Sequence, residues 1–287
     1  WGMGKRGKIA LIGMMTAATT LIGLPASPAS AAPDPSGLVT LTQTFRPAIN
    51  ASVVTGSLAC PAGYRLVGSG GGSDFIGALV PMLPHFEGAT ISVDTVLGDS
   101  ALLTIICAPA DQFTDVKVTQ LADFGVHPGD FRQGVIRCQP GYYAFGGGGY
   151  FTTADDNRIL WDANHGTNAP TADGNGWTFA GLAPSVAHKL VVVTQCAPRT
   201  GRDFLVQFGN SARDSNTLTG SYADCPAGYT AIAGGFYISN SDGSVSDSAT
   251  PIWSVPTSHA ATGRSSWFAA AASPAGTKVV ALAQCAF

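Results

Sequence analysis

Charged side chains are scarce in this chain. Only 11% of its 287 residues are charged, and Glu87 is its single glutamate, whereas ordinary globular domains contain about 25% charged residues. Helix-forming residues other than alanine are also few, while glycine occurs 36 times. Because threonine and valine favour strands and glycine and serine favour turns, this composition predicts an all-β protein.

Basic residues are outnumbered by acidic ones. The formal net charge is −3, and removal of Lys5, Arg6 and Lys8 with an N-terminal leader would leave 12 basic and 18 acidic residues. Nucleic acids and anionic membranes are bound through clustered lysine and arginine. We therefore expect neither nucleic acid nor membrane as a partner of the chain once the leader is cleaved.

Recognisable catalytic and metal-binding motifs are missing as well. The sequence contains no G-x-S-x-G elbow, no H-E-x-x-H pair, no complete EF-hand loop and no C-x2-C pair of zinc ligands. Its five histidines do not recur at matching positions along the chain. We predict no catalytic residue, no metal site and no cofactor from these patterns.

The N-terminal 31 residues have the features of a secretory signal peptide. Lys5, Arg6 and Lys8 precede an apolar run from Ile9 to Leu24, and Ala29-Ser30-Ala31 gives a cleavage signal. A transmembrane anchor is the alternative, but the apolar run is shorter than the roughly 20 residues that span a bilayer. The sequence therefore predicts a secreted, extracellular protein.

One sequence motif, Cys-x-x-Gly-Tyr, occurs three times in the chain after the predicted leader. Each copy is followed by a glycine-rich stretch and then by a hydrophobic run that ends in a second cysteine. The copies are Cys60–Tyr64, Cys138–Tyr142 and Cys225–Tyr229, and the second cysteines are Cys107, Cys196 and Cys285. This pattern predicts three internal repeats, which we place at residues 32–113, 114–202 and 203–287.

All six cysteines belong to this pattern. In an oxidising compartment, six regularly placed cysteines indicate disulfides, for which 15 connectivities are possible. If each repeat closes on itself, the bonds are Cys60–Cys107, Cys138–Cys196 and Cys225–Cys285.

The shared phrase also predicts local structure. Gly63, Gly141 and Gly228 suit a turn position with positive φ, after which the tyrosine begins a strand. A run of glycines within a strand marks a bulge or a close approach of two backbones. Three such runs predict three sheets that meet about a shared axis. A phosphate-binding loop is the alternative, but it requires a following helix, which this sequence does not predict.

The block Cys-Pro-x-Gly-x4-Gly-Gly…Cys-Ala resembles the repeat modules of uncharacterised secreted proteins from high-GC Gram-positive bacteria. The three-sheet arrangement is similar to the β-prism of vitelline membrane outer layer proteins, which are pseudo-threefold and disulfide-bonded. These resemblances imply a compact all-β protein of small antiparallel sheets in a pseudo-threefold, prism-like arrangement. They also imply a binding or coat role.

The tryptophans are the main candidates for ligand contacts. Trp177 and Trp267 begin strand-like runs at comparable distances from their closing cysteines, which favours the core for both. Trp161 lies in a polar loop and Trp253 forms a loose pair with it, so both are candidates for a sugar-binding surface. The predicted ligand-binding residues are Trp161, Asp162, Asn164, His165 and Trp253.

Three functions remain open at this point. The first is a non-catalytic binding or structural module that recognises carbohydrate or a cell-envelope polymer. The second is a secreted polysaccharide hydrolase that uses aspartates such as Asp162 in variable loops. The third is a protein that assembles with itself into a coat. The sequence predicts no oligomeric state.

Overall fold

The structure is a computed structural model that describes twelve stretches of the chain: residues 37–47, 53–73, 76–82, 86–94, 100–112, 115–124, 126–156, 158–159, 165–199, 204–209, 218–272 and 274–286. These residues form antiparallel β-strands and one 3-10 helix, η1 (Ala110–Gln112), without any α-helix. The prediction of an all-β protein is therefore confirmed. The predicted leader, residues 1–31, lies outside this part of the chain. No helix among the described residues is long and apolar enough to cross a membrane.

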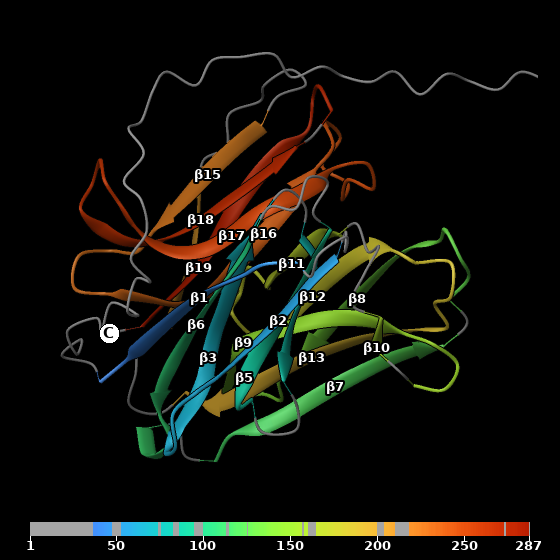
Figure 1. Cartoon of the computed structure of the whole chain (residues 1–287). Helices are drawn as coiled ribbons and strands as arrows, with labels where there is room; N and C mark the ends of the chain where they lie inside the picture. The colour runs from blue at the N-terminus through green and yellow to red at the C-terminus, as the bar shows by residue number, and fades with distance from the viewer. Residues whose placement is uncertain are drawn as a thin grey trace, which may run out of the picture.

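Two six-stranded sheets contain most of the described strands (Figure 1). The first has the order β1 (Val39–Phe45), β6 (Ala101–Pro109), β3 (Tyr64–Gly72), β17 (Thr250–His259), β18 (Arg264–Ala272) and β15 (Leu218–Asp224). The second has the order β14 (Phe204–Phe208), β19 (Lys278–Ala286), β16 (Thr230–Ser239), β11 (His165–Pro170), β12 (Gly176–Leu182) and β8 (Phe131–Arg137).

The remaining strands form a four-stranded and a three-stranded sheet. The four-stranded sheet has the order β10 (Arg158–Ile159), β9 (Tyr142–Thr152), β13 (Lys189–Pro198) and β7 (Lys117–Phe124). The three-stranded sheet has the order β2 (Val53–Ala59), β5 (Gly88–Asp94) and β4 (Ile76–Met82). Strands β4 and β9 contact each other, which brings these two sheets together.

Each six-stranded sheet takes three strands from one predicted repeat and three from another. In the first sheet, β3 pairs with β17 through Gly72 and Trp253. In the second, β16 pairs with β11 through Phe236 and Asn168. The sequence predicted a small sheet for each repeat, but strand pairing crosses the expected boundaries in both six-stranded sheets. The backbone N–H and C=O groups at the edge of one set of three strands thus form hydrogen bonds with the edge strand of the other set.

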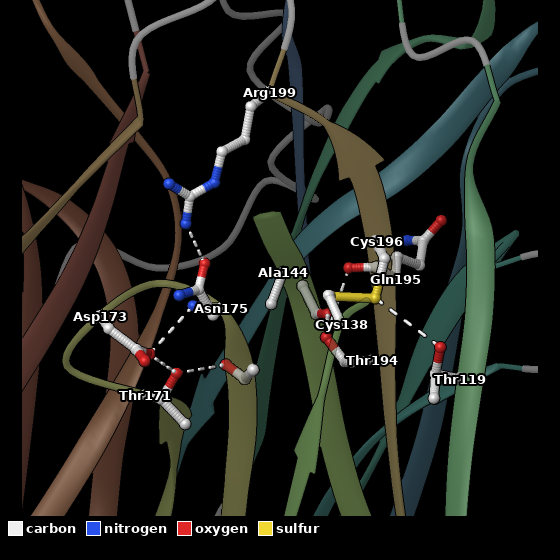
Figure 2. Close-up of a disulfide and its surroundings, with 12 residues drawn as sticks. Thr119, Cys138, Ala144, Thr171, Asp173, Asn175, Thr194, Gln195, Cys196 and Arg199 are labelled. Carbon is white, nitrogen blue, oxygen red and sulfur yellow. Dashed lines mark hydrogen bonds between the residues drawn. A yellow bond between two sulfur atoms is a disulfide. The ribbon is translucent and has the colours of Figure 1, made fainter. Parts of the chain in front are cut away.

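The three disulfides have the predicted connectivity, and the linked cysteines are separated by 47, 58 and 60 positions along the chain. In each case the first cysteine directly follows the strand β2, β8 or β15, and the second lies in β6, β13 or β19. The two linked strands belong to different sheets in all three cases. Figure 2 shows the bond between Cys138 and Cys196, whose sulfur lies 3.7 Å from Oγ1 of Thr119. A loop of this length corresponds to about 4 kcal/mol of lost unfolded-state entropy for each bond.

The turn after each first cysteine also has the predicted form. Gly63, Gly141 and Gly228 have φ of 83°, 87° and 85°. The tyrosine that follows each glycine donates its backbone N–H to the carbonyl three residues earlier, at 3.0–3.1 Å. Glycine adopts this left-handed backbone without the steric cost that a β-carbon would bring, which explains its place in all three copies.

The glycine-rich stretches lie at bulges and at close backbone approaches, as predicted. The pairing of β3 with β6 shifts between Leu66 and Gly68, and that of β16 with β19 shifts between Ala231 and Ala233. A β-carbon on Gly68 would overlap the carbonyl oxygen of Ile232 and lie 3.0 Å from Cα of Ala233. Strands β3 and β16 therefore approach each other more closely than side chains would allow.

The bulges send apolar side chains into a common core. Val67, Phe145 and Ile232 come from β3, β9 and β16, and all three are buried in one cluster. Two buried glutamines, on β13 and β19, form hydrogen bonds with β3 and β9. Nε2 of Gln195 donates to the carbonyl of Leu66 at 2.6 Å, and Nε2 of Gln284 donates to the carbonyl of Ala144. The centre of the molecule thus joins residues from all three predicted repeats.

Candidate binding face

Of the five predicted ligand-binding residues, the structure fully describes Trp253 alone. Trp161, Asp162 and Asn164 lie outside the described residues. His165 begins β11, where its backbone pairs with Gly181, and its side chain is not among those described. Trp253 is a half-buried residue of β17.

Trp177 and Trp267 are core residues, as predicted from their strand-like surroundings. Their exposed fractions are 3% and 0%. Nε1 of Trp177 donates to Oδ1 of Asn168 at 2.8 Å, and Nε1 of Trp267 donates to Oγ of Ser254 at 3.0 Å. Both indole N–H groups thus have buried partners, which a buried polar group requires. Neither tryptophan is available to a ligand.

Trp253 belongs instead to a group of aromatic side chains on β17, β18 and β15. These three strands are adjacent in the first six-stranded sheet (Figure 1). Phe268 lies opposite Val255 on one side and opposite Tyr222 on the other. Trp253 lies opposite Ala270, two residues along β18 from Phe268. Residues directly opposite each other, or two apart on one strand, share a face of the sheet.

We call Tyr222, Trp253, His259 and Phe268 the aromatic face. Tyr222 is 40% exposed, and the other three side chains are half-buried. The same side of β15 continues to Leu218, which is 61% exposed. Exposed apolar side chains that gather in one place mark interaction sites more often than isolated ones do.

Two of these rings lie against glycines. A β-carbon on Gly72 would overlap the indole of Trp253, and one on Gly220 would lie 2.8 Å from Cε2 of Phe268. Each ring therefore covers bare backbone on a neighbouring strand. Strand β3 is paired on both sides and β15, the edge strand of this sheet, is paired with β18, so each ring rests on a hydrogen-bonded strand.

A polar cluster borders the aromatic face at the end of β17. Nδ1 of His259 lies 2.9 Å from both carboxylate oxygens of Asp224. Ser266 donates its hydroxyl to Oδ1 of Asp224 at 2.7 Å, and Thr262 donates to Oδ2 at 3.1 Å. The imidazole of His259 stacks on the Tyr222 ring, with centroids 4.1 Å apart and planes 5° apart. The polar cluster and the aromatic rings are therefore in direct contact.

The carboxyl group of Asp224 has a lowered pKa. Its partial burial acts to raise the pKa, but hydrogen bonds from Ser266, His259 and Thr262 favour the charged form and outweigh that effect. Because the folded-state pKa lies below the unfolded one, ionised Asp224 stabilises the fold at pH values above about 3.9. That stabilisation is lost as the pH falls through the lowered pKa.

This linkage gives a measurable pH dependence for Asp224→Asn. At about pH 7 we expect the free energy of unfolding to fall by about 1–3 kcal/mol, the cost of removing hydrogen bonds to a charged group. The difference from the parent should shrink as the pH falls through the lowered pKa of Asp224, because the carboxyl group of the parent is then protonated as well. Urea unfolding at a series of neutral and acid pH values measures this, with the exposed Asp247→Asn as control. A difference that stays constant with pH would contradict the assignment.

Sequence reasoning identified Trp253 but not the rest of the aromatic face. Alternate residues of β15, from Leu218 to Tyr222, are exposed, and that two-residue period was visible in the sequence. His259 and Phe268 gave no such signal, because their place beside Tyr222 depends on the register of β17, β18 and β15.

The chain matches no protein-family model. A search of curated proteins likewise finds no match to it.

Proposed function

We propose that this chain is a secreted, disulfide-bonded, non-catalytic protein that binds carbohydrate through the aromatic face. The observation that carries this proposal is the set of exposed and half-buried rings lying on one face of a sheet, with hydroxyl and imidazole groups beside them. A sugar ring has an apolar C–H face and a polar rim, and this arrangement offers a complementary surface to both. Binding sites in general combine apolar or aromatic walls with a few placed polar groups.

The residue types of the face also favour recognition. Tyrosine and tryptophan provide large contact areas and lose little side-chain entropy on binding, because each has only two rotatable side-chain bonds. Here Trp253 and Phe268 are already packed against glycines, and Tyr222 is stacked on His259. A ligand would therefore meet rings that are largely ordered before it arrives.

We propose further that the sheets form a pseudo-threefold β-prism. Three strand orders support this: β1-β6-β3, β7-β13-β9 and β14-β19-β16 each contain the glycine-rich strand of one repeat next to the strand that carries its second cysteine. In three places, a strand of one predicted repeat meets the glycine-rich strand of another repeat: β4 contacts β9, β17 pairs with β3, and β11 pairs with β16. Residues 1–31 are expected to be removed as a leader, and the three disulfides are compatible with an extracellular location.

The alternative is a secreted polysaccharide hydrolase that uses loop aspartates. Its main candidate, Asp162, lies outside the described residues, so no observation here favours this alternative. A reducing-sugar assay of the purified protein on the polysaccharides used for binding separates the two functions, since a binding protein releases no sugar.

Binding by the aromatic face is tested with Trp253→Ala and Tyr222→Ala. We expect retention of the purified protein on immobilised polysaccharides to weaken by about tenfold or more in each variant, because aromatic residues dominate recognition energies. Val135→Ala is the matched control, since Val135 is 40% exposed on β8 of the other six-stranded sheet. The proposal fails if the parent is retained on no polysaccharide, or if both aromatic variants bind as well as the control.

A further inference from the structure

The carboxylate of Asp224 is fully occupied by the protein. Its Oδ1 accepts hydrogen bonds from His259 and Ser266, and its Oδ2 accepts them from His259 and Thr262. A carboxylate offers about four lone-pair directions. Asp224 therefore has no remaining site for a ligand hydroxyl, and its role is to hold its neighbours in place.

The neighbour with an available polar atom is His259. In a neutral imidazole, the hydrogen bond made by one nitrogen determines which nitrogen carries the proton. Because a carboxylate only accepts, a neutral His259 carries its proton on Nδ1 and has a lone pair on Nε2. Stacking on Tyr222 fixes the plane of the ring. No described residue forms a hydrogen bond with Nε2, and the His259 side chain is 25% exposed.

The charges near His259 are few among the described residues. Asp224 contributes a negative charge on β15, and Arg264 on β18 lies opposite His259 and is exposed. Sulfate, phosphate and carboxylate groups present only acceptor atoms, so they would meet the lone pair of Nε2 without forming a hydrogen bond. A sugar hydroxyl or an amide N–H presents the donor that Nε2 requires.

We propose that the ligand of the aromatic face is a neutral polysaccharide that donates a hydroxyl or amide hydrogen to Nε2 of His259. Asp224 is the positioning residue that sets the imidazole tautomer. This inference rests on the proposed carbohydrate-binding function and adds the class of carbohydrate. A site that is arranged to form one hydrogen bond discriminates strongly against groups that cannot form it, because a polar atom is then left unpaired.

The experiment compares neutral and anionic probes at about pH 8, at the upper end of the range in which histidine ordinarily titrates. The neutral probes are soluble cellulose oligosaccharides, laminarin and mannan, and the anionic probes are polygalacturonate and a glycerol-phosphate polymer. We expect the parent to bind at least one neutral probe, and to bind the anionic ones more weakly, because their anionic groups cannot donate to Nε2 although their hydroxyls can. His259→Phe keeps a stacking ring but removes Nε2, and should weaken neutral binding by about tenfold.

Asp224→Asn tests the positioning role separately. An asparagine amide can donate to Nδ1, which would move the imidazole proton to Nε2 and reverse its hydrogen-bonding character. We expect the nitrogen-15 spectrum of His259 to show the other tautomer, and the preference for neutral over anionic probes to shrink. A merely structural role would change neither the tautomer nor the preference.

Each remaining outcome counts against a stated part of the inference. Binding of polygalacturonate that is stronger than that of every neutral probe, and that is lost in Arg264→Gln, would show that the ligand is anionic, while the proposed carbohydrate-binding function would stand. Unchanged neutral binding in His259→Phe would refute the role of Nε2. An unchanged His259 tautomer in Asp224→Asn would refute the positioning role. Retention of the parent on no probe would refute the proposed function itself.

Discussion

Replacing Gly235 with valine is expected to prevent folding of the protein. Gly235 lies in β16 where this strand meets β11, and a β-carbon there would overlap the carbonyl oxygen of Asn168. It would also lie 2.7 Å from Cα of Ala169. Both obstacles are backbone atoms of a paired strand, so no rotamer change relieves the overlap. The junction between the two halves of this six-stranded sheet would have to separate.

The yield of oxidised monomer, its circular dichroism and its thermal transition measure this effect. Ser258→Val is the matched control, because it adds the same β-branched side chain at an exposed position of the strand β17. Valine suits an exposed strand position, so the control should fold like the parent. A Gly235→Val protein with the yield and transition of the parent would show that β16 and β11 do not approach as closely as described.

Replacing Trp267 with alanine should lower the free energy of unfolding by about 3–5 kcal/mol. The indole is fully buried, and it lies against Gly234, whose β-carbon would be 2.5 Å from Cγ of the ring. Its removal leaves a cavity and also leaves Oγ of Ser254, a residue that is 1% exposed, without its indole partner. Denaturant unfolding of the oxidised protein measures the change. A loss below about 1 kcal/mol would contradict this role, since core tryptophans rarely cost so little.

The first segment of the chain supplies a natural comparison for Trp267. Ala89 lies opposite Pro81, as Trp267 lies opposite Pro256. Ser69 on β3 corresponds to Gly234 on β16. Ser69 pairs with the residue two positions before Cys107, and Gly234 pairs with the residue two positions before Cys285. The first segment thus has a smaller residue, Ala89, where the third has Trp267, and a larger residue, Ser69, where the third has Gly234. Adding Gly234→Ser to Trp267→Ala is nevertheless not expected to recover the lost stability, because a β-carbon at position 234 would also lie 2.4 Å from the backbone carbonyl oxygen of Leu282.

Local features of this fold could be predicted from the sequence because a few neighbouring residues determine them. The positive φ of Gly63, the bulge beside Gly68 and the burial of Trp267 all followed from short patterns. The disulfides followed from the regular spacing of paired cysteines. No local pattern reports that Gly72 pairs with Trp253, which is 181 residues away along the chain. The exchange of strands between segments could therefore not be predicted.

The aromatic face shows the same limit on a smaller scale. Trp253 was recognisable as a candidate from its residue type, whereas His259, Phe268 and Tyr222 become neighbours only through the register of three strands. The hydrogen bonds of Asp224 require that register together with the turn that carries Thr262. Function here depends on cross-strand neighbours, and a single sequence contains little information about them.

The sharing of sheets between distant segments also sets the order in which the protein can mature. The first six-stranded sheet needs β1, β3 and β6 together with β15, β17 and β18. A ribosome completes the early strands long before the late ones, so the edge of β3 has no partner until β17 has been synthesised. Pairings of such long sequence separation form slowly. This sheet is therefore expected to be completed only after most of the chain has been synthesised.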